Sequence, residues 1–161
     1  MVILLMGVAG CGKTTVGRAL AAALGWSFRD ADDFHPPANI TKMSAGQPLA
    51  DADRAPWLAA IRAHIDACLA RGENAVVTCS ALKAAYRAAL IADPARVRLV
   101  HLTSDPALIA KRLARRLDHF MPPAMLASQF ATLEPPRKAL TIDVAGTTDQ
   151  IVAQIRQALS L

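Results

Sequence analysis

Residues 7–14 read GVAGCGKT and follow directly on the apolar run VILLM at residues 2–6. The eight residues fit the pattern G-x-x-x-x-G-K-[ST] without a mismatch. A short, wholly apolar run is typical of a strand buried on both faces, and residues 13–24 place apolar side chains at helical spacing before Gly25. Strand, glycine-rich loop and helix in this order predict the opening of a parallel α/β sheet with a phosphate-binding loop.

The composition of this loop suits a polyphosphate. Its glycines let the backbone N–H groups turn inward, and the start of the helix adds partial positive charge. Lys13 can reach the terminal phosphates, and the Thr14 hydroxyl can serve as a ligand of Mg²⁺. We therefore expect ATP or a close relative to contact Gly7, Val8, Ala9, Gly10, Cys11, Gly12, Lys13, Thr14 and Thr15. Two alternatives fit less well: a glycine-rich turn that only joins strand to helix, and the dinucleotide pattern G-x-G-x-x-G, which needs glycine where Thr15 stands.

The rest of the chain continues the alternation of strand and helix. Apolar runs predict further strands at 26–30, 75–79, 97–102 and 140–144. Helical spacing is found at 53–71, 83–92, 105–117 and 124–133, and a last helix opens with Thr147 and Gln150 at capping-box spacing. This order predicts a five-stranded parallel sheet covered by helices on both faces. We find no internal repeat or linker, so residues 1–161 are expected to form one domain.

Composition limits the class of protein. No apolar run reaches the roughly 18 residues of a membrane span, and the N-terminus lacks the charged region of a secretory signal. The three cysteines are too few and too widely spaced for a disulfide framework or a metal site. A cytoplasmic protein without a membrane partner is therefore expected. The net charge of +5 suits an anionic small molecule or nucleic acid, but the basic cluster at 111–116 has no interleaved aromatic residues, so we expect no nucleic acid.

Two carboxylates stand where the second strand ends. Asp30 closes the run at 26–30 and Asp32 follows it, whereas the third strand ends in Thr78-Cys79-Ser80 without an acidic residue. In a parallel sheet, the carboxyl ends of the strands face the same crevice as the loop. A carboxylate there can orient Mg²⁺ or accept a proton from a substrate hydroxyl. Two aspartates after a strand are also common in turns and helix caps, which is the alternative interpretation.

The predicted helix at 105–117 combines an apolar stripe with a basic arc. Arg112, Arg115 and Arg116 are three and four residues apart and can therefore point the same way. The helix leads into HFMPP at 119–123, which has the prolines of a hinge. On its own, such a run of arginines would be interpreted as the solvent-exposed face of a helix. Beside a phosphate-binding loop it predicts a lid over about residues 112–128 that brings arginines to the transferring phosphoryl group.

Four segments together resemble bacterial gluconokinase, a small P-loop kinase related to shikimate and nucleoside-monophosphate kinases. They are GVAGCGKT, DADDFHPPANITKMSAGQPLADADRAPWL (30–58), CSALKAAYR (79–87) and HFMPPAMLASQFATLEPP (119–136). The resemblance extends over essentially the whole chain, and the last three segments are more specific than the loop. Two departures are Ala31, where glycine is expected between the two aspartates, and Cys11, where serine is more usual.

The resemblance implies transfer of the ATP γ-phosphoryl group to the 6-hydroxyl of D-gluconate, with Mg²⁺, as a step in carbohydrate acid catabolism. It also implies a homodimer. Gluconate is a polyol with one carboxylate, so segment 30–58 must supply hydroxyl partners and a cation. The implied catalytic residues are Lys13, Asp32, Arg112 and Arg116, and the implied metal ligands are Thr14 and Asp30. The implied substrate contacts are Asp32, with the proton-accepting role, and His35, Asn39, Lys42, Arg54, Lys83, Arg87 and His119.

Two other functions stay open at this point. One is another small-metabolite kinase, such as a shikimate or nucleotide kinase. The glycine-rich turn that shikimate kinases carry after the third strand is replaced here by CSALK at 79–83. The other, from a different class, is a nucleotide-dependent RNA-binding module, which the isoelectric point near 9.6 would suit.

Overall fold

A single parallel sheet organises the molecule. The structure is a computed structural model, and it describes residues 1–114 and 123–161. The strands are β1 (Val2–Met6), β2 (Ser27–Asp30), β3 (Ala75–Thr78), β4 (Val97–Thr103) and β5 (Leu140–Asp143). They lie in the order β2-β3-β1-β4-β5, and every neighbouring pair is parallel. Since β1 is the central strand, the loop that follows it emerges at the middle of the sheet's carboxyl edge.

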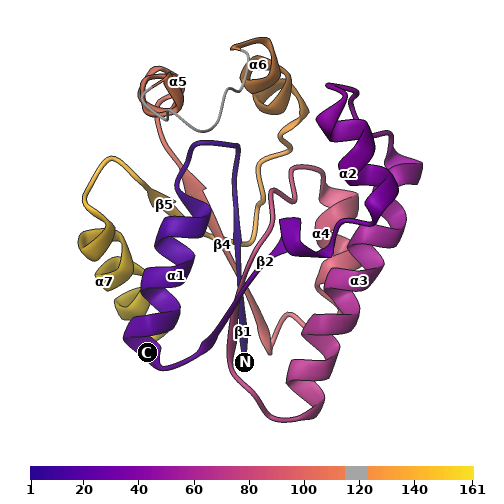
Figure 1. The fold of residues 1–161 in the computed structure, drawn as a ribbon. Coiled ribbons are helices and arrows are strands. Elements are labelled where there is room, and N and C mark those ends of the chain that lie inside the picture. Colours follow the sequence, from indigo (N-terminus) through magenta and orange to yellow (C-terminus); the bar gives the residue numbers. More distant parts are fainter. Residues whose placement is uncertain (115–122) are drawn as a thin grey trace.

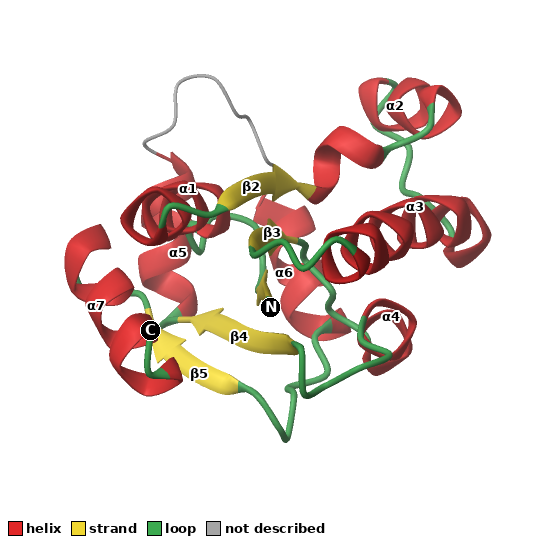
Figure 2. Cartoon of the chain, turned by 90° about the horizontal axis from the view of Figure 1, so that it is seen from below, coloured by secondary structure: helices red, strands yellow, loops and turns green. Residues whose placement is uncertain are grey.

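Helices cover both faces of the sheet, as the alternation of elements predicts (Figures 1 and 2). One face carries α1 (Lys13–Leu24) and α7 (Thr148–Leu159), and the other carries α3 (Asp51–Ala70) and α4 (Ala84–Leu90). Alternate β1 residues point to opposite faces, so Leu5 packs in the cluster with Leu20 and Ile155, whereas Leu4 packs with Ile61. Both layers of side chains are fully buried. This double burial explains why β1 is apolar throughout.

Short helices lie above the carboxyl edge of the sheet (Figure 1). They are η1 (Ala31–Phe34), α2 (Pro37–Ser44), α5 (Pro106–Ala114) and α6 (Pro123–Thr132). The sequence did not predict η1 or α2, because three carboxylates and two prolines obscure any helical spacing at 30–43. Pro37 occupies the first position of α2, where its missing N–H costs no hydrogen bond and its φ suits a helix. The segment is thus two short helices rather than a polar loop.

The predicted fold is confirmed, and the bounds of several elements differ by one or a few residues. The helix expected from residue 53 begins at Asp51. The basic helix expected over 105–117 is present as Pro106–Ala114, and its remaining residues lie outside the described part of the chain. Residues 115–122 of the predicted lid, with Arg116 and His119, also fall outside the described part of the chain. Within the described residues, we find no helix that combines the length and apolar character of a membrane span.

Candidate active site

The loop at 7–14 has the backbone of a phosphate cradle without any ligand. Gly7 and Gly10 have φ angles of 147° and 81°, which favour glycine over other residues. A Cβ on Gly10 would also come within 2.6 Å of Leu113 Cγ, because α5 packs directly on the loop. The Lys13 ammonium donates to the carbonyl oxygens of Gly7 at 3.0 Å and Val8 at 3.1 Å. The loop and its lysine are therefore already shaped for a polyphosphate.

A hydrogen bond joins this loop to the end of β2. Thr14 lies in the first turn of α1, and its Oγ1 donates to Oδ2 of Asp30 at 2.7 Å. The other oxygen of Asp30 accepts the backbone N–H of Asp32 at 3.2 Å, which caps η1. The two predicted metal ligands thus lie together at the crevice. A hydroxyl and a carboxylate oxygen are the ligand types that hard divalent cations prefer.

Asp32 projects into the crevice beside a histidine. Its carboxylate is 87% exposed and lies 4.0 Å from Nε2 of His35. Partial desolvation in the crevice and then the negative charge of Asp30 raise the pKa of Asp32. Because the side chain is so exposed, water keeps this effect small. Its direction nevertheless suits a group that must accept a proton.

His35 is held in a fixed orientation by its neighbours. Its ring stacks on Trp57, with the centroids 4.5 Å apart and the planes 6° from parallel. Nδ1 lies 3.4 Å from the amide nitrogen of Asn39. Burial lowers the pKa of His35 despite the nearby Asp32 carboxylate. We therefore expect a neutral imidazole at neutral pH.

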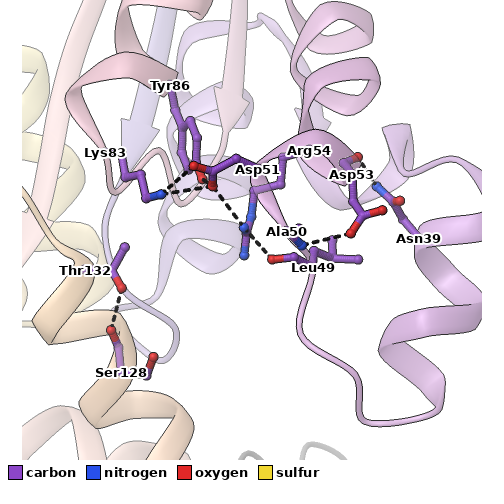
Figure 3. Close-up of polar contacts among 10 residues, drawn as sticks. All are labelled: Asn39, Leu49, Ala50, Asp51, Asp53, Arg54, Lys83, Tyr86, Ser128 and Thr132. Carbon is purple, nitrogen blue, oxygen red and sulfur yellow. Dashed lines mark hydrogen bonds and ion pairs between the residues drawn. The ribbon is translucent and has the colours of Figure 1, made fainter.

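The predicted substrate cations meet carboxylates from the first turn of α3 (Figure 3). Lys83 donates to Asp51 at 2.7 Å, and Arg54 lies 3.5 Å from the same carboxylate. Lys42 donates to Asp53 at 2.6 Å. The hydrogen bond from Lys83 is the main cause that lowers the pKa of Asp51. The cations therefore lie at the mouth of the crevice, but each already has an anionic partner.

Two predicted substrate contacts serve the protein framework. Arg87 is buried, and its Nη1 donates to the carbonyl oxygens of Ala81 and Leu82 at 3.0 and 2.9 Å. This guanidinium therefore supports the turn that carries Lys83, and its expected contact with the substrate stays a prediction. Asn39 is 3% exposed and donates to the backbone of Asp53 at 2.8 Å. It ties α2 to the start of α3.

Arg112 lies on the opposite side of the loop from Asp32. Its Nη2 donates to the carbonyl oxygen of Val144 at 2.6 Å, just beyond β5. A cavity of about 330 Å³ opens there between the loop, α5 and the start of α7. Its lining is Gly10, Cys11, Gly12, Thr15, Val16, Arg112, Val144, Gly146, Thr148 and Ile151. The loop thus separates this cavity from the crevice that contains the carboxylates.

Several residues of the site carry no sequence signal of their role. Tyr86 donates its hydroxyl to Asp51, and Trp57 donates its indole N–H to the Ala31 carbonyl oxygen at 2.7 Å. Gln129 of α6 accepts the backbone N–H of Ala9 at 2.7 Å. Each partner is at least 26 residues away in the chain. Only the three-dimensional fold brings these pairs together.

Comparison with known proteins agrees with this geometry. A family model described as an AAA domain matches residues 2–136. The gluconokinase of Gluconobacter oxydans is 52% identical over 83% of this chain and 75% of its own length. The thermosensitive gluconokinase of Escherichia coli is 41% identical over 97% of this chain and 86% of its own. The crystal structure of a gluconokinase from Sinorhizobium meliloti superposes with a TM-score of 0.82, at 41% identity, over 98% of this chain and 94% of that one.

Proposed function

We propose that this chain, which belongs to the gluconokinase family, transfers the γ-phosphoryl group of ATP to the 6-hydroxyl of D-gluconate. The observation that carries the proposal is the hydrogen bond between Thr14 and Asp30. It joins a phosphate-binding loop to a crevice lined with carboxylates, cations and a histidine. Phosphoryl transfer needs this adjacency, because its catalysis is mostly positioning and charge stabilisation.

The nucleotide is assigned to the loop and to the cavity beside Arg112. Backbone N–H groups of the loop and the Lys13 ammonium would bind the phosphates. The cavity between α5 and the start of α7 would take the nucleoside, and the planar Arg112 guanidinium could stack on its base. This placement points the terminal phosphate toward the carboxylates at the end of β2.

Thr14 and Asp30 fit a bound Mg²⁺. Mg²⁺ is commonly held by one or two carboxylates together with substrate phosphates, so few protein ligands are needed. When bound, the ion would neutralise charge on the phosphate oxygens. Thr14 Oγ1 would then turn a lone pair to the cation rather than donate its proton to Asp30.

The sugar acid is assigned to the crevice between η1, α2 and the first turn of α3. Lys83 and Arg54 would exchange the Asp51 carboxylate for that of gluconate, with Lys42 nearby. Asp32 would accept the proton of the 6-hydroxyl as the new P–O bond forms. Neutral His35, whose ring stacks on Trp57, would hold the Asp32 carboxylate and a sugar hydroxyl in a fixed relative position.

Substrate-dependent release of ADP tests the proposal. D-gluconate with ATP and Mg²⁺ should give steady turnover, whereas shikimate and nucleoside monophosphates should give none. Turnover with shikimate or a nucleoside monophosphate and none with gluconate would assign the chain to another kinase class. ATP-dependent binding of RNA without any turnover, with a steep dependence on salt, would instead favour a nucleic-acid-binding module.

A further inference from the structure

A contact between α6 and the phosphate-binding loop is not explained by the nucleotide or the sugar acid sites. The backbone N–H of Ala9 donates to Oε1 of Gln129 at 2.7 Å, and the two residues are 120 positions apart. Backbone N–H groups of such loops are donors for phosphate oxygens. A side-chain amide oxygen therefore occupies one donor of the cradle.

The position of this amide is fixed by a packed helix. Leu126 of α6 is 7% exposed and belongs to the same core cluster as Val8 and Cys11 of the loop. Phe130, next to Gln129, packs against that cluster. Gln129 is therefore presented to the loop by an element that is itself anchored on the loop.

The hydrogen bond also determines which way the amide faces. A backbone N–H can only donate, so the Gln129 oxygen must face Ala9 and the NH₂ group must face away. Among the described residues, none accepts a hydrogen bond from this NH₂ group. It is a neutral donor pair next to the loop that the described residues leave available.

The chain just beyond α6 contacts the turn that carries one of the proposed gluconate cations. Glu134, just beyond α6, donates its backbone N–H to Leu82 at 3.0 Å and accepts the N–H of Ala84 at 2.6 Å. These residues flank Lys83, one of the cations assigned to gluconate. Figure 1 shows α6 above the sheet between α5 and α2. Neither Ala9 nor Gln129 lines the cavity beside Arg112, so we place this donor on the acceptor side of the loop.

We infer that Gln129 is a catalytic residue that binds the γ-phosphoryl group through its NH₂ while its oxygen holds the Ala9 peptide. The inference rests on the proposed kinase function, in which the γ-phosphate is the part of ATP nearest the acceptor. A donor at this point stabilises charge on the transferring group without adding a fixed cation.

Binding and turnover of two Gln129 variants test the inference. Gln129→Glu keeps an acceptor for Ala9 but replaces the donor by a negative charge. A non-hydrolysable ATP analogue should then bind at least about 10-fold more weakly, whereas ADP, which lacks the γ-phosphate, should bind within about 3-fold of the parent. Gln129→Met removes both hydrogen bonds, and kcat should fall at least about 10-fold while KM for gluconate changes little.

Gln154, exposed on α7, provides the matched control. Gln154→Glu makes the same charge change and should leave all three measurements at the parent values. Thermal melting should show both Gln129 variants folded. Equal weakening of ADP and the ATP analogue, or no effect on either, would overturn the assignment to the γ-phosphoryl group. Turnover of gluconate by the parent protein is measured separately, so failure of the kinase function itself would be recognised.

Discussion

At the residue scale, the structure gives Asp30 and Asp32 different surroundings, although they are only two positions apart in the chain. Both Asp30 oxygens are engaged, one by Thr14 and one by the Asp32 backbone, so this carboxylate suits a fixed metal ligand. Asp32 makes no hydrogen bond to a described residue through its carboxylate and faces the crevice. The free carboxylate is the one that can accept a substrate proton.

Asp32→Asn should therefore lower kcat by about 10² or more while KM for gluconate changes little. The amide keeps the shape of the side chain but cannot take the proton. Steady-state kinetics of this variant beside Asp33→Asn, an exposed neighbour, provides the comparison. A severe loss of kcat in Asp30→Asn together with a mild loss in Asp32→Asn would show that the two assigned roles are reversed.

The dependence of kcat/KM on pH gives a second test of Asp32. The base must be ionised, so activity should fall as the pH is lowered through its pKa. Partial desolvation and then Asp30 raise that pKa, which places the acidic limb above the pH expected for an ordinary aspartate. The negative charge of Asp33 also raises the pKa of Asp32. Asp33→Asn removes this charge, so the acidic limb of the kcat/KM profile should move to lower pH. No movement would indicate that another group titrates.

Lys13→Ala should leave the fold intact and lower turnover by about 10² or more. Among the described residues, the ammonium donates hydrogen bonds to two loop carbonyl oxygens, so we expect little packing to be lost. Thermal melting and ADP release are the measurements, and Lys138→Ala, exposed before β5, is the control. Near-normal turnover in Lys13→Ala would refute the assigned phosphate-binding loop.

At the scale of elements, the accuracy of prediction depends on how local the determining interactions are. The loop and α1 were predicted because adjacent residues specify a strand, a turn and a helix start. The helices η1 and α2 were missed because His35 and Asn39 are placed by Trp57 and Asp53, which lie in the next long helix. The framework contacts of Arg87 were not predicted for a similar reason, since a cation near the crevice can also bind the turn that precedes its own helix.

The turn before α4 illustrates this structural role. Ala81 has a φ of 43°, in the left-handed region that non-glycine residues rarely adopt, and Arg87 binds its carbonyl oxygen. Arg87→Met would remove the described hydrogen-bond partner of the buried Ala81 carbonyl oxygen and leave the Leu82 carbonyl oxygen with the Glu134 N–H, which should cost about 2 kcal/mol of stability. For a chain of this size that is a fall in Tm of roughly 4–8 °C.

Thermal unfolding of Arg87→Met beside Arg98→Met, an exposed arginine of β4, measures this loss. The control should melt near the parent. Where Arg87→Met remains folded at the assay temperature, we expect a small change in KM for gluconate. A parental Tm with a large rise in KM would place Arg87 among the substrate contacts.

At the scale of the whole molecule, the central position of β1 creates a site with two sides. The cavity that we assign to the nucleotide lies toward β5, and Asp30 and Asp32 stand at the end of β2, so the proposed function places both substrates beside one loop. The sequence predicts the parallel sheet and its active edge from the alternation of elements. It could not predict which elements bridge the two sides, because contacts such as that between Ala9 and Gln129 join residues far apart in the chain.

Helix α6 is the described element that touches both sides, and its protection should require both ligands. ADP alone would order the loop, which contacts α6 through Gln129. Gluconate alone would order the turn around Lys83, which contacts the segment just beyond α6 through Glu134. Both contacts lie toward the C-terminal end of α6, so each ligand restrains one of the two contacts and leaves the other free to open. Hydrogen exchange of amides in 123–132 should therefore slow slightly with either ligand and much more with both.

Peptides from α7 provide the internal reference, because Thr148 and Ile151 of this helix line the cavity that we assign to the nucleotide. Their exchange should slow with ADP and change no further when gluconate is added. The two responses together distinguish a bridge between sites from a general stiffening of the protein. Full protection of 123–132 by ADP alone would show that α6 belongs to the nucleotide side only, and the coupling of the two sites would then have to pass through the Thr14 and Asp30 contact.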